Sequence, residues 1–168
     1  MKTKKILCTL MAVMCIGTAA LTGCGSDSDS STANSANSAA AAQTNESVDV
    51  TAVADKLKDS IEFKDELAEA KIEKIIGISA DSYTKAKVYV SSSGGTAEEI
   101  DCFEAKDADS AKAIADTLTA RVESQKKVFE NYVPEEMTKL NDPVLVTNGN
   151  YVYLCLSNDN DKAKEIIG

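Results

Sequence analysis

The feature that most constrains the fold is a long amphipathic stretch, residues 107–132, which lies between two segments that alternate like β-strands. Its apolar side chains recur at helical spacing, and Asp107 at its start is a suitable N-cap. Pro134 ends the helix, because a proline disfavours helical geometry in the residue before it. The residues on the predicted face are Ala111, Ile114, Ala115, Leu118, Val122, Gln125, Phe129 and Tyr132.

The two flanking segments are predicted to be β-hairpins. Residues 83–91 alternate polar and apolar side chains, and residues 98–105 return after a glycine-containing turn. Residues 143–157 form the second hairpin, whose Asn148-Gly149 pair favours a tight turn. Two hairpins around a long helix predict the α+β class, with an antiparallel sheet of about four strands packed against that helix.

Shorter helices are predicted toward both ends of the domain. Apolar spacing indicates helices over residues 50–61 and 65–76, and a last helix over residues 159–167. The domain as a whole is expected to span residues 47–168, a length that supports one modest core.

Residues 1–23 have the order of parts found in an export signal, with a lysine-rich start and an apolar run at 6–21. The motif Leu21-Thr22-Gly23-Cys24 matches a lipobox, in which Cys24 receives a diacylglycerol group and becomes the first mature residue. A membrane-spanning helix is the alternative, but the apolar run is shorter than the ~20 residues that such a helix needs. We therefore expect a lipoprotein anchored on the extracytoplasmic face of the cell membrane. No cofactor is expected beyond the acyl modification at Cys24.

Residues 24–46 consist almost entirely of small and polar side chains. Such a segment cannot bury enough apolar surface to offset its ordering entropy, so we expect a disordered tether. The signal holds three of the 18 basic residues and none of the 27 acidic ones, which gives the mature chain a net charge of −12. A chain this acidic is not expected to bind nucleic acid, and its contact with the membrane is expected through the lipid anchor.

Several short motifs follow one another along the domain. They are Ala97-Glu98-Glu99-Ile100, Phe103-Glu104-Ala105-Lys106-Asp107, Arg121 with Gln125, Phe129 with Tyr132 and Pro134, and Gly149-Asn150-Tyr151-Val152. In this order they resemble the small lipoproteins of clostridial-type Gram-positive bacteria grouped as domain of unknown function family 4358. The resemblance covers roughly residues 50–158. It implies a lipoprotein address and an α+β domain, and it brings no activity.

The sequence excludes several chemistries. It contains no histidine, which removes the usual general base near neutral pH and the Ser-His-Asp arrangement. Residues 158–161 with Glu165 superficially resemble a calcium loop but lack the glycine that such a loop requires at its sixth position. We therefore expect neither a catalytic motif nor a metal site.

Arg121 and Gln125 lie one helical turn apart beside the apolar face of the long helix. One interpretation is a guanidinium clamp for a carboxylate or phosphate ligand. The alternative, which we favour, is an arginine whose stem covers the core edge while its head pairs with a nearby glutamate.

Cys102 and Cys155 are the two cysteines of the domain. If Ile100 points inward, so does Cys102, whereas Cys155 should point outward when Leu154 and Leu156 point inward. Opposite faces of a sheet cannot be bridged, so we expect two free thiols.

The same alternation predicts a tyrosine–lysine surface on the outer face of the sheet, which could bind a partner because tyrosine offers contact area and a polar tip. The alternative is that the two N-terminal helices cover this face. The residues concerned are Tyr83, Lys85, Lys87, Tyr89, Tyr151 and Tyr153.

These patterns favour a non-enzymatic, membrane-tethered module that binds an envelope protein or ligand through the open sheet face. The alternative is an envelope enzyme or enzyme accessory, which a cleft holding two converging carboxylates of raised pKa would indicate. A transporter's solute-binding lipoprotein is disfavoured, since that class needs two lobes around a cleft.

Overall fold

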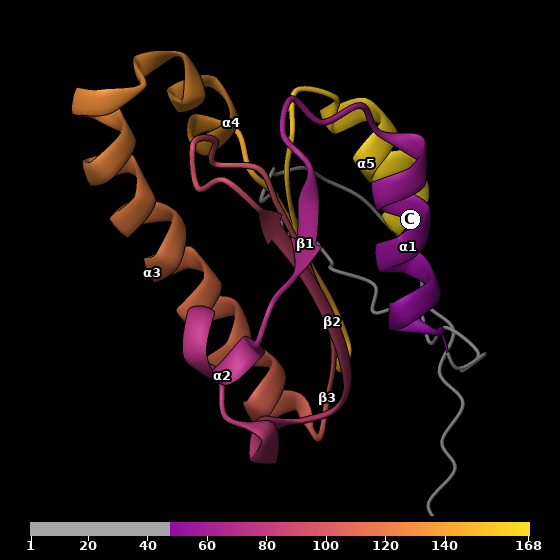
Figure 1. Ribbon diagram of the computed structural model, residues 1–168. Coiled ribbons are helices and arrows are strands. Elements are labelled where there is room, and N and C mark those ends of the chain that lie inside the picture. The colour runs from indigo at the N-terminus through magenta and orange to yellow at the C-terminus, as the bar shows by residue number, and fades with distance from the viewer. Residues whose placement is uncertain (1–47) are drawn as a thin grey trace, which may run out of the picture. The chain divides into compact units, whose positions relative to one another are not determined.

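Five strands form one antiparallel sheet, in the order β1-β2-β3-β5-β4, in the computed structural model of the chain (Figure 1). The strands are β1 (Leu67–Glu69), β2 (Tyr83–Ser91), β3 (Glu99–Ala105), β4 (Val144–Asn148) and β5 (Tyr151–Leu156). The structure describes residues 48–168. The predicted signal, lipobox and tether at residues 1–46 lie outside the described residues, and so does Cys24.

Helices cover both faces of this sheet (Figure 1). The long helix α3 (Ala108–Tyr132) packs on one face, with α2 (Ile72–Ile75) and α4 (Met137–Asn141) beside it. On the other face lie α1 (Val50–Ser60) and α5 (Asn160–Ile167). Two 3₁₀ turns, Ala80–Ser82 and Pro134–Glu136, join these elements. Between residues 48 and 168, no helix is long and apolar enough to cross a membrane.

The two faces have separate cores, because successive side chains of a strand point to opposite sides. Beneath α3, the buried residues include Val88, Phe103, Ile114, Leu118, Val122, Val152, Leu154 and Leu156. Beneath α1 and α5, they include Val50, Ala54, Leu57, Tyr89, Ile100, Cys102, Tyr153 and Cys155. The α+β class is therefore confirmed, with one strand more than predicted and with both faces of the sheet covered.

The predicted ends of the long helix are confirmed. The Asp107 side chain caps α3 by accepting a hydrogen bond of 2.7 Å from the backbone N–H of Ser110. The helix stops at Tyr132, before Pro134, as the proline requires. In the second hairpin, Gly149 takes the left-handed conformation, with a φ of 59°, that the predicted tight turn needs.

The helix predicted over residues 65–76 is wrong. Its first part is the edge strand β1, in which Leu67 pairs with Ser91 and Glu69 with Tyr89. Only the short helix α2 remains of the prediction, and Gly77 follows it with a φ of 84°. Short apolar runs fit either period, and here pairing with β2 decided the outcome.

An irregularity in β2 changes the orientation of its first residue. The register shifts between Tyr83 and Lys85, so Tyr83 faces α3 while Lys85 faces α1. The Tyr83 ring packs edge-on against Phe103, with ring centroids 5.5 Å apart. Tyr83 therefore does not share a face with the other five residues of the predicted tyrosine–lysine surface.

Candidate functional site

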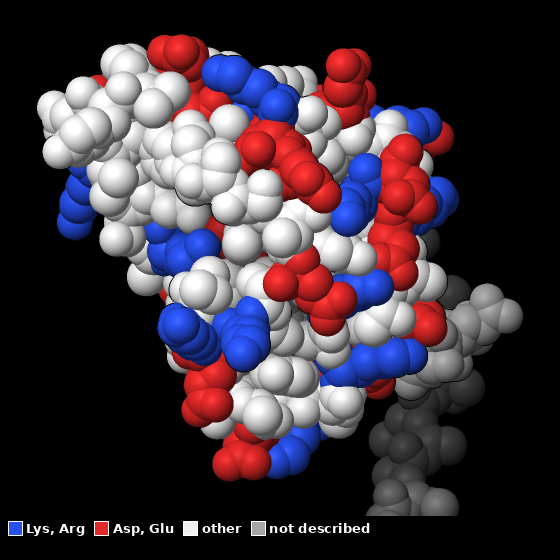
Figure 2. All heavy atoms as spheres, in the orientation of Figure 1, with Lys and Arg blue, Asp and Glu red and all other residues white. Residues whose placement is uncertain are grey.

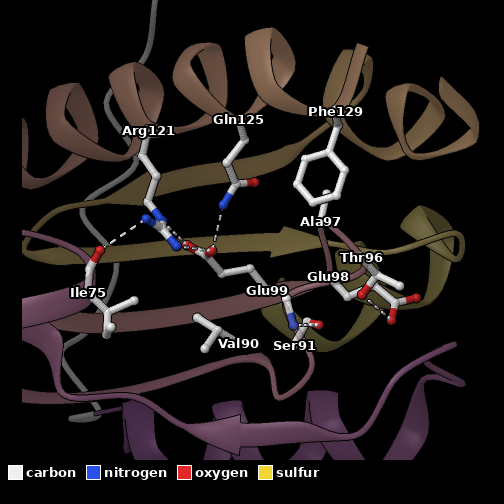
Figure 3. Close-up of a pocket in the computed structure, with 11 residues that line it drawn as sticks. Ile75, Val90, Ser91, Thr96, Ala97, Glu98, Glu99, Arg121, Gln125 and Phe129 are labelled. Carbon is white, nitrogen blue, oxygen red and sulfur yellow. Dashed lines mark hydrogen bonds and ion pairs between the residues drawn. The ribbon is translucent and has the colours of Figure 1, made fainter. Parts of the chain in front are cut away.

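Arg121 and Glu99 form a two-point ion pair on the α3 face of the sheet (Figure 3). The guanidinium donates through Nε to Glu99 Oε1 at 2.6 Å and through Nη2 to Oε2 at 2.7 Å. This two-point geometry matches a planar guanidinium to a planar carboxylate. Glu99 is 2 % exposed at its side chain and Arg121 22 %, so the acid is buried and its partner reaches it from the edge.

Two further hydrogen bonds join this pair to its surroundings. Arg121 Nη1 donates to the carbonyl oxygen of Ile75 at 3.1 Å, and Gln125 Nε2 donates to Glu99 Oε2 at 3.0 Å. This pairing of Arg121 with a nearby glutamate confirms the interpretation that was favoured over a ligand clamp. An anionic ligand would have to displace Glu99 to use the same fork of donors.

Asp101 lies two residues beyond Glu99 on β3, on the same side of the strand. Its side chain is 0 % exposed, and no cation or N–H group binds its carboxyl, whose protonated form shares a hydrogen bond with Glu99. Burial raises the pKa of Asp101 well above its ordinary value, and the nearby charge of Glu99 raises it further. Arg121 acts in the opposite direction but more weakly. Asp101 is therefore held as a neutral carboxylic acid.

A second buried network begins at Glu98, the residue just before β3. Lys139 Nζ lies 2.9 Å from Glu98 Oε1 and 2.8 Å from Glu136 Oε2, and all three side chains are at most 2 % exposed. Glu98 also accepts two backbone hydrogen bonds of 2.9 Å, from Lys64 and Asp65. The desolvation of Glu98 favours a higher pKa, but these hydrogen bonds and Lys139 outweigh it, so its pKa is lowered.

A pocket of about 210 Å³ lies between α3 and the hairpin of β2 and β3 (Figure 3). Its apolar walls come from Ile75, Val90, Ala97 and Phe129, and its polar walls include Thr96, Glu98, Glu99, Arg121 and Gln125. Gln125 Oε1 is a buried oxygen without a hydrogen-bond partner. The acids at this pocket are already bound by cations and N–H groups, so the site can hold a small group but offers no free base.

The turn at the rim of the pocket is organised by Asp65. This carboxylate accepts hydrogen bonds from both the Ser91 and Ser93 hydroxyls and from the backbone N–H of Ser93, the last at 3.1 Å. The serine hydrogen bonds lower the pKa of Asp65 to about 2. Asp65 is therefore ionised and serves the turn rather than proton transfer.

The predicted tyrosine–lysine surface is not open. Lys85, Lys87, Tyr89, Tyr151 and Tyr153 do face one side, but α1 and α5 cover that side. Tyr89 is only 7 % exposed and Tyr153 3 %. Tyr153 belongs to the core, and Tyr151, whose ring stacks on it with centroids 6.5 Å apart, packs against that core at its rim. The expectation of an open docking face is therefore wrong. Two helices cover the face, α1 from the start of the domain and α5 from its end.

The lysines of this face bind α1 to the sheet. Lys87 Nζ lies 2.7 Å from Asp55 Oδ1, and the Tyr89 hydroxyl donates to the same oxygen at 2.6 Å. Lys85 pairs with Asp49, the N-cap of α1, at 2.9 Å. Hydrogen bonds from Lys87 and Tyr89 lower the pKa of Asp55. These residues therefore have a structural role.

Cys102 and Cys155 are both free, as predicted, and both are buried. The prediction that they lie on opposite faces of the sheet is wrong, because both thiols lie on the same face, beneath α1. Ile100 faces α1 rather than α3, which reverses the assumed orientation of Cys102. Cys102 pairs in register with Tyr153, and Cys155 with Ile100, so the cysteines are diagonal neighbours.

The acidic stretch at residues 158–161 begins the last helix. Asp159 caps α5 by accepting a hydrogen bond of 3.0 Å from the backbone N–H of Lys162, and Asn160 donates to Asp142 at 2.9 Å. Among residues 48–168, no group of three or more acidic or cysteine side chains is placed to hold a metal ion.

The sequence reasoning missed the buried acids Glu98, Glu99 and Asp101, and it missed Lys139, the partner of Glu98. The available signal was the segment EEIDCFEA, which places Glu98, Glu99 and Asp101 within a strand whose apolar residues predict burial. A charge in such a strand indicates a buried ion pair or a neutral acid. Which acid takes which partner depends on long-range packing.

The comparisons with known proteins give one match. The model of a protein family described as a domain of unknown function (DUF4358) matches residues 59–157. The matched segment includes the acids of β3, the Arg121–Gln125 pair and Lys139. No curated protein and no solved structure matches the chain.

Proposed function

The chain belongs to the DUF4358 family, and we propose that its domain is a non-enzymatic binding module, held outside the cell membrane by a lipid on Cys24. The anchor rests on the sequence alone, through the apolar run at 6–21 and the lipobox that follows it. Two acyl chains on one residue give stable anchoring, whereas a single chain gives marginal binding.

The observation that carries the binding role is the state of the acids at the pocket between α3 and the β2–β3 hairpin. Glu99 is bound by Arg121 and Gln125, and Glu98 by Lys139 and two backbone N–H groups. A general base needs a free lone pair within reach of a substrate. These side chains instead form rigid walls around a small cavity, which suits recognition.

A carboxylate enzyme is the second candidate, because Asp101 and Glu99 form a carboxyl pair in which one pKa is strongly raised. Asp101 does not line the pocket and is fully buried under α3. Catalysis would require α3 to move away from the sheet. A turnover assay in which Asp101→Asn abolishes activity while the fold persists would favour this candidate over binding.

The anchor is tested by changing Cys24 to Ser and growing cells with an alkyne-bearing fatty acid. We expect the unmodified chain to carry the label and to remain with the membrane fraction, and the variant to lose both. The chain with Lys127→Ala is the matched control and should keep both. A labelled Cys24→Ser chain would contradict the proposed anchor.

Binding is tested by placing a photo-crosslinking residue at position 132 in the full chain in cells, with position 127 as control. Tyr132 is 83 % exposed at the end of α3, about one helical turn beyond Phe129, which lines the pocket, and Lys127 points away from the pocket on the same helix. We expect a discrete adduct, protein or glycan, at position 132 that is absent at 127. The absence of any adduct at 132 would count against a binding role at this site.

A further inference from the structure

The pocket between α3 and the β2–β3 hairpin is small and selective in charge. Its volume of about 210 Å³ is below the ~300 Å³ at which pockets for drug-sized ligands begin, so it takes one small group. The rest of a larger ligand would lie on the surface outside. Size alone therefore points to one unit of a longer molecule.

The charges at the pocket favour an uncharged group. Glu99 is neutralised by Arg121, and a second anion here would face both Glu98 and Glu99. A cation would compete with Arg121 for an acid that is already held at two points. Arg121 uses three of its five N–H groups, which leaves two donors for a neutral oxygen.

The walls of the pocket combine these donors with apolar surface. Figure 3 shows Ile75 and Val90 on one side and Phe129 on the other, with Arg121 and Gln125 between α3 and the sheet. A group that fits such walls carries a methyl or a C–H face beside a carbonyl oxygen. The acetamido group of an amino sugar has both.

The surface outside the pocket is suited to sugar rings. The face of α3 that carries Gln125 and Phe129 continues to Tyr132, which is 83 % exposed. Residues 92–96 of the hairpin, of which Gly94 and Thr96 line the pocket, are Ser, Gly and Thr only. Figure 2 shows that the upper left of the domain, where Figure 1 places the end of α3 and this hairpin, is largely free of charged side chains. An exposed aromatic ring allows stacking on the face of a sugar and offers its own hydroxyl as a polar tip, whereas the Ser93 and Thr96 hydroxyls are bound to Asp65 and Glu98.

We propose that this pocket and Tyr132 bind an uncharged oligosaccharide through one N-acetylated amino-sugar unit. The inference rests on the proposed binding function and names the ligand class of that same site. A protein partner is less well matched, because protein interfaces are centred on large, well-packed apolar anchors and this pocket is small.

The test uses the full lipid-bearing chain in detergent and a trisaccharide of β-1,4-linked N-acetylglucosamine as the probe. Binding is measured by saturation-transfer NMR and calorimetry, with the corresponding glucose trisaccharide as the ligand that lacks the acetamido group. We expect binding of the first ligand at millimolar concentration and binding of the second to be weaker by about tenfold. Equal binding of the two ligands, or none of the first, would overturn the proposal.

Tyr132→Ser is the decisive variant, because a side chain that is 83 % exposed can be removed without unfolding the domain. We expect it to weaken binding by about tenfold and Lys127→Ala, on the opposite side of α3, to leave it unchanged. Equal affinities of the two variants would contradict the assigned site. A protein adduct at position 132 without trisaccharide binding would overturn the ligand class while leaving the proposed binding function in place.

Discussion

Glu99 and Asp101 face the same helix from the same strand, yet only Glu99 has a cationic partner, and Asp101 shares a hydrogen bond with Glu99 when it is protonated. The difference follows from position. Arg121 reaches down from α3 to Glu99 at the start of β3, whereas Asp101 lies further along the strand, between Glu99 and the buried Phe103. One acid of the pair is therefore held by a cation, and the other, whose pKa is raised by burial, binds its proton more tightly in the folded state.

Asp101→Asn should change how stability depends on pH. Because the pKa of Asp101 is raised in the folded state, the native protein holds this proton more tightly than the unfolded chain does. The free energy of unfolding must then fall as the pH rises above the pKa that Asp101 has in the unfolded chain. The fall is at most ~1.4 kcal/mol per pH unit. Asparagine does not titrate, so this loss is absent from the variant. The free energy of unfolding of the variant, relative to that of the unmodified protein, should therefore increase between pH 4 and 8.

Urea unfolding at pH 4, 6 and 8 measures this gain. Burying the asparagine amide costs free energy, so the stabilities of the two proteins can already differ at pH 4. The prediction therefore concerns how this difference changes with pH. Parallel stability profiles for the two proteins would show that Asp101 is not a neutral acid in the fold.

Arg121→Met should be strongly destabilising, because it leaves Glu99 buried without its cation. Breaking a buried pair in this way costs about 3–5 kcal/mol. The double variant Arg121→Met with Glu99→Met should recover most of the loss, since an apolar pair of similar size avoids the desolvation of two charges. Chemical denaturation of both variants is the measurement, and a double variant no more stable than the single one would be the contrary result.

Much of this fold was readable from the sequence because its strongest elements are local. The cap at Asp107, the stop before Pro134 and the Asn148-Gly149 turn each act within a few residues, and all three were predicted correctly. The strand β1 was missed because three residues carry no reliable period and it exists only by pairing with β2. The irregularity after Tyr83 was missed for the same reason, since a register shift belongs to two strands at once.

Lys139→Met should destabilise the protein at least as much as the loss of Arg121. Lys139 is the direct partner of both Glu98 and Glu136, and the other cation near Glu136, Lys64, lies 3.9 Å away and is 59 % exposed. Removing Lys139 leaves two buried carboxylates, at a cost of about 3–5 kcal/mol or more. Thermal unfolding at neutral pH measures the effect.

Lys112→Ala is the matched control for this variant. Its pair with Asp116 has a similar short distance, 2.6 Å, but the two side chains are 75 % and 67 % exposed. Exposed pairs add little to stability, so the control should unfold with the unmodified protein. Equal losses from the two lysines would mean that burial does not decide their importance.

Cys102 and Cys155 should resist alkylation in the folded protein at pH 8. Burial raises the pKa of Cys155 to about 12 and that of Cys102 well above its ordinary value, and the thiolate is the reactive form. Both should react rapidly in urea. Iodoacetamide labelling followed by peptide mass analysis checks this, and rapid native labelling of either thiol would contradict the burial described above.

The candidate site was less predictable than the fold, for a physical reason. Helical spacing placed Arg121 beside Gln125, but it could not say that Glu99 would occupy the guanidinium. The tyrosine–lysine surface failed because the assignment of faces along β2 and β5 says nothing about which helices cover them. Partners drawn from distant segments are fixed by packing, and packing is a property of the whole domain.

The strand order has a consequence for how the chain is made. β3, the middle strand, has its second neighbour in β5, near the end of the chain, because Glu99 pairs with Leu156 and Glu104 with Tyr151. During synthesis from the N-terminus, one edge of β3 therefore stays unpaired until almost the whole polypeptide has been produced. Such an edge is a template for association between chains. A fragment ending before Tyr151 should accordingly aggregate, and the growing chain has to be protected until its last strand arrives.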